Sequence, residues 1–433
     1  MRTPRRKRPS LAVMAAVVAM VAMVCSSGTS AAASSGGSAP GVTSSTITVA
    51  SLATSSGALS SGFVDLIYGV KAYLDMVNAH GGVDGRKIIW SKVADDQASP
   101  TTDEIQARNL VEQDHVFAIV GVATPFFESG PYLASTGTPT FGYLVEGGWN
   151  KYPNLFGAYG SEIGYNTRAG VLTYVAHEEH AQSVAVLAYG FVATSKDACQ
   201  AAATGMKRNG VNVAYQDLDM TYLEDPTSDV EQMAAHHTDL VLTCLDGPED
   251  LSIAESLHQY GVNAKEIWEN GYDRATVRQN AAALSGDLFY LQHVPFEAVQ
   301  EFPGKYPSMA QYIATMNKYE PTWTYDDISF QGWVNAELFV AGLRAVGRDL
   351  TQQKLVNAIN KMTDFTAGGL IAPVNWKTAH TKSTPPFCSA WLQVTTSGKY
   401  QSVLVQHGDQ TYMCFGATSP TVLPFPAGVE PNG

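Results

Sequence analysis

Charged side chains are scarce in this sequence. They make up 15% of its 433 residues, whereas aliphatic and aromatic residues make up 45%, which is ample for buried cores. After the first 33 residues, no segment approaches the 18 continuous apolar residues of a membrane-spanning helix. A chain of this length fills two or three domains of ordinary size. These features indicate a globular protein without an internal membrane span.

Positive charge is scarcer still. The 27 Lys and Arg residues stand against 40 Asp and Glu, and five of the basic residues lie within the first eight positions. Without those five the balance is 22 against 40, a net charge of −18. Nucleic acids and anionic membrane surfaces are bound by basic patches. The charge balance therefore argues against both as partners, and it leaves small ligands open.

Recognisable catalytic and metal-binding motifs are also missing. The sequence has no G-x-S-x-G, no P-loop, no G-x-G-x-x-G and no C-x-x-C. The stretch "HEEH" at 177–180 resembles a zinc motif, but its histidines are three residues apart where zinc proteases need four. We interpret it as a solvated helix end. We expect no enzyme activity, no cofactor and no bound metal.

The first 33 residues have the pattern of an export signal. A basic start, "MRTPRRKRPS", precedes the apolar run "LAVMAAVVAMVAMV", which is too short to span a membrane comfortably. Two ways of processing stay open: cleavage after Ala33, or lipid attachment to Cys25. Residues 34–45 continue as a Ser/Gly/Ala-rich flexible tether, which suits an anchored domain. We expect an exported protein of the cell envelope or exterior, either released or lipid-anchored.

Four cysteines follow the leader, an even number that predicts two disulfides in an exported chain. Cys199 lies early in an expected helix, and Cys244 ends a strand about two elements later. Cys388 and Cys414 bracket an expected β-ribbon near the C-terminus. We predict the pairs 199–244 and 388–414, because each closes within one supersecondary neighbourhood.

From residue 46 onward, strand-like and helix-like segments alternate. Such alternation predicts βαβ units on a parallel sheet. A second round of the same alternation begins after "NLFGAYG", so we expect two α/β lobes. Helices over 329–347 and 351–362 should return to the first lobe, and the tail from Gly368 should end in the second. Expected strands cover 46–53, 87–96, 116–123, 138–144, 183–190, 212–220, 239–245, 266–272 and 287–294.

Several motifs carry a family resemblance. "NAHGGVDGRKI" at 78–88 closely resembles the connector after the first helix of the Leu/Ile/Val-type periplasmic binding proteins, the solute-binding subunits of ABC importers. "GTPTFG", "GGWNKYPNLFG", "FQGWVNAELFVAGLRAVG" and "LVNAINKMTDFTAGGLIAPVNW" follow in the family's order. Together they cover roughly residues 46 to 415. Each motif alone is modest, and the ordered set is a strong signal.

The resemblance implies the α/β type I periplasmic-binding fold, in which two parallel-sheet lobes are joined by three hinge crossings and close over a small ligand. It implies a monomer whose partners are a small-molecule ligand and an ABC-transporter permease. The first lobe would contain 46–150 plus 296–373, and the second 151–295 plus 374–433. The crossings would lie near Tyr143–Ala158, His293–Phe296 and Ala372–Asn375.

Candidate ligand-binding residues follow the expected strands. In open α/β sheets, ligands bind outside the carboxyl ends of the strands. Thr124 could also cap a helix there, whose free N–H groups suit a ligand carboxylate. Ser and Asp at such places are also ordinary caps and turns. The candidates are Ser61, Thr124, Phe126, Tyr143, Glu146, Tyr189, Asp246, Tyr272 and Asp273.

The candidate site departs from the family pattern. "ATPFF" replaces a serine-rich stretch after the third strand, and Leu144-Val145-Glu146 replaces small residues after the next. These changes argue against a plain branched-chain amino acid, and a bulkier aromatic or amide-bearing ligand fits equally well. We expect a non-enzymatic solute-binding protein that captures an amino acid, amide or related polar or aromatic compound for an ABC importer. The alternatives are an extracellular sensor on the same fold and a secreted hydrolase.

Overall fold

The computed structural model describes residues 39–145, 147–161, 169–381, 387–404, 411–415 and 422–423. The export signal and Cys25 lie outside these residues. Within them, none of the helices is both long and apolar enough to cross a membrane. The first lobe includes residues before 46, because Val42 is buried and forms a bridge with Ile47. The end of the predicted tether is therefore part of the first lobe.

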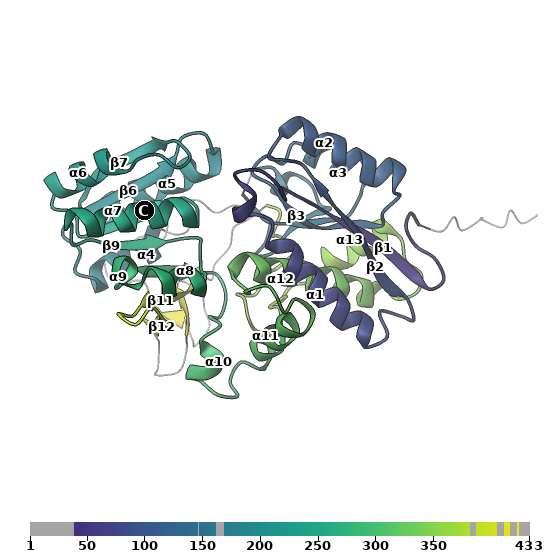
Figure 1. Cartoon of the computed structure of the whole chain (residues 1–433). Helices are drawn as coiled ribbons and strands as arrows, with labels where there is room; N and C mark the ends of the chain where they lie inside the picture. The colour runs from purple at the N-terminus through teal and green to yellow at the C-terminus, as the bar shows by residue number, and fades with distance from the viewer. Residues whose placement is uncertain are drawn as a thin grey trace, which may run out of the picture. The chain divides into compact units, whose positions relative to one another are not determined.

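The first lobe is built on a parallel five-stranded sheet with the order β2-β1-β3-β4-β5, of which Figure 1 labels β1, β2 and β3. Its faces are apolar on both sides, as parallel sheets require. One face packs on α1, α12 and α13, with α11 lying against α1, and the other face packs on α2 and α3. The strands are β1 (Thr46–Ala53), β2 (Lys87–Asp95), β3 (Ala118–Ala123), β4 (Thr140–Gly142) and β5 (Leu155–Gly157). The helices are α1 (Leu66–Ala79), α2 (Pro100–Arg108) with a π turn (Asn109–Gln113), α3 (Gly130–Thr136), α11 (Pro307–Tyr319), α12 (Asp327–Val346) and α13 (Gln352–Ile359).

Helices α1 and α12 touch backbone to backbone near their N-terminal ends. A Cβ atom added to Gly69 would lie 1.7 Å from the Ser329 carbonyl oxygen, and one added to Gly332 would lie 1.9 Å from that of Leu66. No side chain fits in either place, so both positions require glycine. The late segment of the chain is thereby fixed against the first helix of the lobe.

The second lobe is built on a mixed sheet with the order β14-β13-β11-β10-β9-β8-β6-β7, with β12 beside β11. Strands β6 to β10 are parallel, and β11 joins β10 antiparallel. Helices α4 and α5 cover one face, and α6 and α7 the other. The strands are β6 (Val184–Tyr189), β7 (Val213–Met220), β8 (Leu240–Cys244), β9 (Lys265–Trp268), β10 (Leu288–Leu291), β11 (Phe387–Val394), β12 (Tyr400–Val403), β13 (Tyr412–Phe415) and β14 (Val422–Leu423). The helices are α4 (Ala169–Glu178), α5 (Ala193–Arg208), α6 (Thr227–Ala235), α7 (Gly247–Tyr260), α8 (Arg274–Gln279) and α9 (Ala281–Leu284). Short helical turns cover Ser60–Gly62, Trp149–Lys151 and α10 (Ala298–Glu301).

The two parallel α/β lobes confirm the predicted fold class. The lobes divide at different residues from those predicted, however. Strand β5 pairs with β4, so residues 151–157 belong to the first sheet. Trp376 packs its ring edge-on against Phe156 of that strand at 5.2 Å, which also places the chain near residue 376 with the first lobe. Helix α11 was not predicted from the sequence, although its buried residues Met309, Tyr312, Thr315 and Met316 lie on one helical face.

A disulfide joins Cys199 of α5 to Cys244 at the end of β8, as predicted. Both residues are buried. Cys388 is also disulfide-bonded. The strand register sets Cys388 opposite Cys414, although the Cys414 side chain is outside the described atoms. The pair 388–414 therefore stays a prediction.

Removing the first disulfide should destabilise the second lobe. The bridge spans 45 residues of sequence, and a cross-link of this kind contributes about 2–4 kcal/mol by restricting the unfolded chain. We expect the double variant Cys199→Ala/Cys244→Ala to unfold at lower urea concentration without losing its secondary structure. Equilibrium urea unfolding followed by circular dichroism measures this. An unchanged midpoint would show that the bridge restricts nothing in the unfolded state.

A buried carboxyl in the first lobe predicts a pH-dependent contribution to stability. Burial raises the pKa of Asp103 to about 7, although the Ser129 amide donates to its Oδ2 at 2.6 Å. The unfolded chain releases this proton near pH 4, so between pH 4 and 7 the folded state holds more protons. The contribution of Asp103 to folding is therefore greatest at low pH and is lost as pH rises through 7.

The variant Asp103→Asn should remove this dependence, because its amide oxygen still accepts from Ser129 and does not titrate. We expect the variant to gain stability relative to the wild type between pH 5 and pH 8. Urea midpoints of both proteins at the two pH values measure the difference. The exposed control Asp197→Asn should keep a constant offset from wild type, and a constant offset for Asp103→Asn would contradict the assignment.

Candidate functional site

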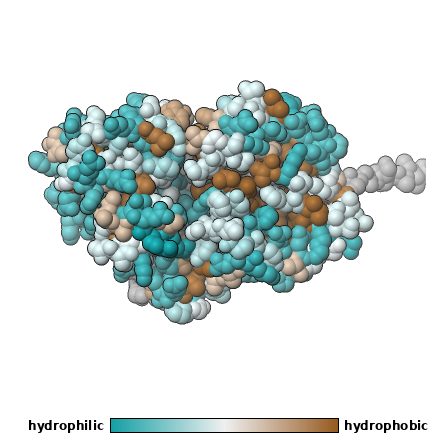
Figure 2. All heavy atoms as spheres, in the orientation of Figure 1, coloured by the Kyte–Doolittle hydropathy of each residue, from teal (hydrophilic) through white to brown (hydrophobic). Residues whose placement is uncertain are grey.

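A cavity of about 860 Å³ lies between the carboxyl ends of the two parallel sheets. Its walls come from the segments that follow β1, β3 and β4 in the first lobe and β6, β8, β9 and β10 in the second. The start of α12 closes one side. This is the place where open α/β sheets bind ligands. Figure 2 shows hydrophobic residues gathered near the middle of one face, while hydrophilic residues cover much of the periphery.

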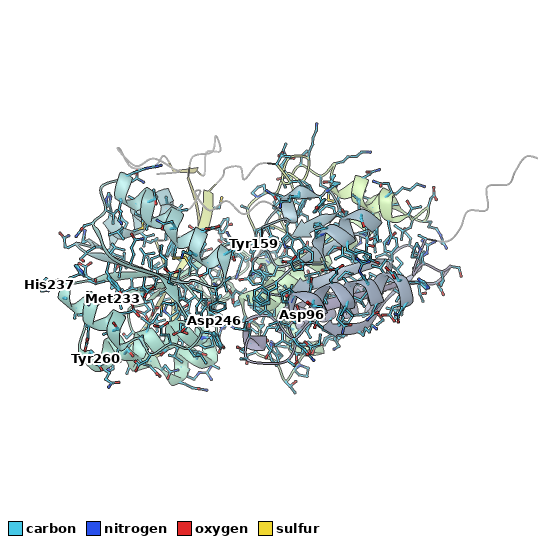
Figure 3. All side chains as sticks on the ribbon, turned by 90° about the horizontal axis from the view of Figure 1, so that it is seen from above. Asp96, Tyr159, Met233, His237, Asp246 and Tyr260 are labelled. Atoms are coloured by element: carbon cyan, nitrogen blue, oxygen red, sulfur yellow. A yellow bond between two sulfur atoms is a disulfide. The ribbon has the colours of Figure 1, made fainter. Side chains whose placement is uncertain are left out.

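The loop after β1 is anchored by two consecutive aspartates at the end of β2. Asp95 accepts from the Ser55 amide at 3.0 Å and from the Ser56 hydroxyl at 2.5 Å. Asp96 accepts from the Thr54 hydroxyl at 2.6 Å and lies on the first lobe (Figure 3). These bonds fix the start of the loop that carries Ser61 to the cavity.

The second-lobe wall centres on Asp246, which Figure 3 shows on the side of that lobe turned toward the first. Asp246 is the N-cap of α7, and its Oδ1 accepts from the Glu249 amide at 3.3 Å. The same oxygen accepts from the Tyr189 hydroxyl at 2.8 Å. Burial raises the pKa of Asp246, and the Tyr189 bond opposes that rise. Asp246 therefore combines an ordinary capping role with a place in the cavity wall.

Hydrogen bonds cross from one lobe to the other at the cavity. The Tyr143 hydroxyl, after β4, donates to the Asn270 side-chain oxygen at 3.0 Å. Asn270 in turn donates to the Leu245 carbonyl at 3.0 Å. The Tyr222 hydroxyl donates to the Ala58 carbonyl at 3.1 Å. Side chains at the cavity edge therefore already link the two lobes.

The structure brings five of the nine predicted residues into the cavity lining: Ser61, Tyr143, Tyr189, Asp246 and Asp273. Glu146 lies outside the described residues. Thr124, Phe126 and Tyr272 do not line the cavity. Thr124 is 2% exposed, and its hydroxyl oxygen accepts from the Phe126 amide at 3.1 Å. It therefore closes a turn and does not cap α3, which begins at Gly130, and Pro125 of the same turn lines the cavity instead.

Tyr272 packs against the second crossing on the side away from the cavity lining. It is 1% exposed, and its ring stacks on Phe296 at 4.8 Å. Its hydroxyl donates to Glu297 and accepts from the Phe296 amide. Asp273 does line the cavity, but both of its oxygens already accept bonds from the first turn of α8. The sequence pattern placed these two residues near the right strand end without revealing their partners.

Three further aspartates in the lining were not predicted: Asp65, Asp326 and Asp327. Asp65 precedes α1, and the other two begin α12. Burial, followed by the charge of Asp326, raises the pKa of Asp65 to about 10. Burial and then Asp326 raise the pKa of Asp327 to about 7. The local signal was Asp326-x-x-Ser329, which forms a reciprocal capping box, but the helix was expected to begin at Ser329, two residues after its observed start.

His293 lies at the second crossing and also lines the cavity. Its Nδ1 is 2.8 Å from the Val294 carbonyl oxygen, so that nitrogen carries the proton. Burial lowers the pKa of His293 to about 4, which makes the ring neutral at pH 7. Among the described residues, no three His, Cys, Asp or Glu side chains are grouped so that they could hold a metal ion.

A family model for periplasmic binding proteins matches residues 46–399, most of the chain. The chain belongs to the periplasmic binding protein family. This confirms the family predicted from the sequence motifs, whose members are binding proteins and are exported. No curated protein sequence matches this chain.

Solved structures with the same fold cover most of the chain at low identity. A fatty acid ABC transporter substrate-binding protein from Thermomonospora curvata is 18% identical, with a TM-score of 0.67 over 91% of this chain and 98% of its own. A solute-binding protein from R. palustris in complex with benzoate is 14% identical, with a TM-score of 0.67 over 87% and 99%. The branched-chain amino acid binding protein LivJ from Streptococcus pneumoniae, in complex with isoleucine, is 16% identical, with a TM-score of 0.65 over 83% and 99%.

Truncating Asp246 should destabilise the second lobe even without a ligand. Asp246→Ala removes the cap of α7 and the acceptor of Tyr189, so we expect a loss of about 1–2 kcal/mol in the free energy of unfolding. Asp246→Asn keeps an acceptor oxygen and should lose less. Urea unfolding of both variants, with Asp197→Ala as the exposed control, measures the loss. Equal losses for the Ala and Asn variants would argue against the capping role.

Proposed function

We propose that this protein captures a small organic solute in the cavity between its lobes and delivers it to the permease of an ABC transporter. The observation that carries the proposal is the cavity itself. Its volume of about 860 Å³ lies in the range of ligand pockets, and its walls come from the strand ends of both lobes. Such a ligand touches Ser61 and Tyr143 on one side and Tyr189 and Asp246 on the other.

Contact with both lobes couples binding to the position of the lobes. A solute held by both walls stabilises the arrangement in which the walls face each other, at the expense of arrangements in which they are apart. The bond from Tyr143 to Asn270 adds to the same arrangement. A permease that docks on both lobe surfaces would then recognise the loaded protein. We propose that the protein acts as a monomer without enzymatic activity.

The ligand class is an amino acid, an amide or a related polar or aromatic compound. Support comes from the lining, which combines aromatic rings such as Phe63, Phe191 and Trp323 with hydroxyl, amide and carboxyl groups. The related structures hold isoleucine and benzoate, which also combine an apolar body with a polar end. Export, with Cys25 as the point of a lipid anchor, would hold the protein near its permease.

A thermal-shift screen of small solutes tests this proposal, because a solute that binds only the folded state raises the melting temperature. For a solute that binds, we expect Asp246→Asn to weaken affinity about five- to 150-fold, because the amide cannot form the charge-assisted hydrogen bond that a carboxylate makes to a ligand donor. Titration calorimetry measures the change. The controls are Asp197→Asn and His177→Ala, both on exposed helix positions of the same lobe, and both should bind like wild type.

Two results would contradict the proposal. Solutes that bind equally well to wild type and to Asp246→Asn and Tyr143→Phe would be bound outside the cavity. Chemical conversion of a bound solute by the purified protein would favour a hydrolase on this fold.

A further inference from the structure

The side chains of the cavity lining that can carry a charge at neutral pH are all acidic. Within the described part of the chain, the lining contains no lysine or arginine. It contains six acidic residues: Asp65, Asp246, Glu269, Asp273, Asp326 and Asp327. A net charge of −13 over the whole chain does not account for this, because 27 basic residues are available.

The acidic residues on the hinge side crowd one another. The charges of Asp326, Asp327 and Asp273 all act on Asp65 in the same direction, and Asp65 shares a hydrogen bond with Asp326. Asp326 also caps α12, but the Asp65 side chain makes no cap bond to α1. Helix capping therefore does not explain why position 65 is occupied by an acidic residue.

The nearest arginine in the sequence does not neutralise this group. Arg274 follows Asp273 directly, but its Nε donates to Glu297 at 3.0 Å. Its guanidinium lies over the rings of Tyr325 and Phe296, 4.4 and 4.9 Å from their centroids. Arg274 therefore serves the hinge: its hydrogen bonds go to Glu297 and to the Tyr325 carbonyl, and none goes to Asp65, Asp326 or Asp327 among the described residues.

The second-lobe side adds acidic residues behind the wall. Asp250 lies one turn beyond Asp246 in α7 and is fully buried. The charges of Asp246, Glu249 and Glu269 act on Asp250 in the same direction. The N-terminus of α7 offsets part of this charge through its dipole. It supplies no mobile donor to the cavity.

His293 is an independent sign that a donor is missing. Its Nδ1 donates to the Val294 carbonyl, so its Nε2 is an acceptor. That atom has no hydrogen-bond partner among the described atoms, in a side chain that is 1% exposed and lines the cavity. A buried acceptor without a donor is costly. A ligand with N–H groups would satisfy it.

Aromatic rings stand beside these acceptors. Trp323 stacks on Tyr68 at 4.1 Å, and Phe63 lies 6.2 Å from Tyr143. Tyr159 and Tyr189 also belong to the aromatic lining, as do Phe191, Trp268 and Tyr290. Rings of this kind bind the apolar body of a ligand and attract a cation at their faces.

We propose that the ligand is an organic cation, an amine with a net positive charge on an apolar or aromatic body, held by the cavity carboxylates and the acceptor of His293. This rests on the proposed function and narrows it. An anion here would meet acidic side chains and, in the described lining, no lysine or arginine, whereas a buried charge needs a partner of opposite sign. A zwitterion would have to place its carboxylate among acidic side chains, with backbone N–H groups as the available donors.

A matched series of probes tests the charge directly. The series is 2-phenylethylamine, phenylalanine, 3-phenylpropionate and 3-phenylpropanol, which vary the charge on similar bodies, together with 1,4-diaminobutane as an aliphatic dication. Each is titrated calorimetrically into the full mature protein. We expect at least one of the two cations to bind, and to bind at least tenfold more tightly than the neutral alcohol and the anion.

Variants connect the charge preference to the cavity. Asp327→Asn and Asp65→Asn each remove one acceptor of the hinge-side group and should weaken cation binding about tenfold or more, as expected for a charge-assisted bond. Asp197→Asn, an exposed aspartate of α5, should leave it unchanged. Melting curves show whether each variant is folded, and the probe comparison on the wild type needs no variant.

The outcomes separate this inference from the proposed function. If the neutral alcohol, the anion or phenylalanine bound more tightly than either cation, and Asp246→Asn weakened that binding, the inference of a cationic ligand would be wrong. The proposed function in solute capture would still be supported. Cation binding that is abolished by salt but unaffected by both cavity variants would be non-specific surface attraction, and it would also overturn the inference. Failure of every solute in this series and in the thermal-shift screen would contradict both.

Discussion

The contact between α1 and α12 is the constraint on which the rest of the site depends. These helices approach so closely at Gly69 and Gly332 that only glycine fits. The contact lies near the N-terminal end of each helix, so it brings together Asp65 and Asp326, residues far apart in the sequence. A packing requirement in the core of the first lobe therefore determines which carboxyl groups meet at the cavity wall.

The parallel sheets impose a second constraint. Helices cover both faces of each parallel region, so polar groups can gather without burial in a core only where the strands end. The cavity lies at those ends in both lobes. The same loops must also end strands and begin helices, which explains why Asp246 and Asp273 act as N-caps as well as lining residues. Capping and ligand contact are compatible roles when one face of the carboxyl group stays open.

Much of the fold could be predicted from the sequence, because buried parallel strands are continuous apolar runs. The expected strand 46–53 coincides with β1, and the order of βαβ units is correct. Helix α11 was not predicted, although Met309, Tyr312 and Met316 recur at helical spacing in its sequence. The predicted lobe boundary fell before β5, because a three-residue edge strand inside a crossing has no periodic signal at all.

The site was harder to predict than the fold. Strand ends are visible in a sequence, so Tyr143, Tyr189 and Asp246 could be placed at the cavity. Nothing local distinguishes Tyr272, whose partners Phe296 and Glu297 come from the following crossing. The role of Asp65 also could not be predicted from the local sequence. Its neighbour Asp326 lies in a segment that returns to the first lobe only after the chain has crossed between the lobes twice. A residue whose role depends on contacts with distant parts of the chain has no recognisable pattern in its local sequence.

The acidic cavity also suggests how recognition and lobe position would be linked. The carboxyl groups come from both lobes, Asp65 and Asp327 from the first and Asp246 from the second. Without a ligand, burial and mutual repulsion raise the pKa of Asp65 and Asp327, so protons reduce the charge that the facing walls must carry. A bound cation would replace those protons and attract both walls at once. The carboxyl groups would therefore repel one another when the lobes face each other without a ligand, and would attract a bound cation when it is present. A ligand can shift the population of lobe positions only through such a difference in interaction energy.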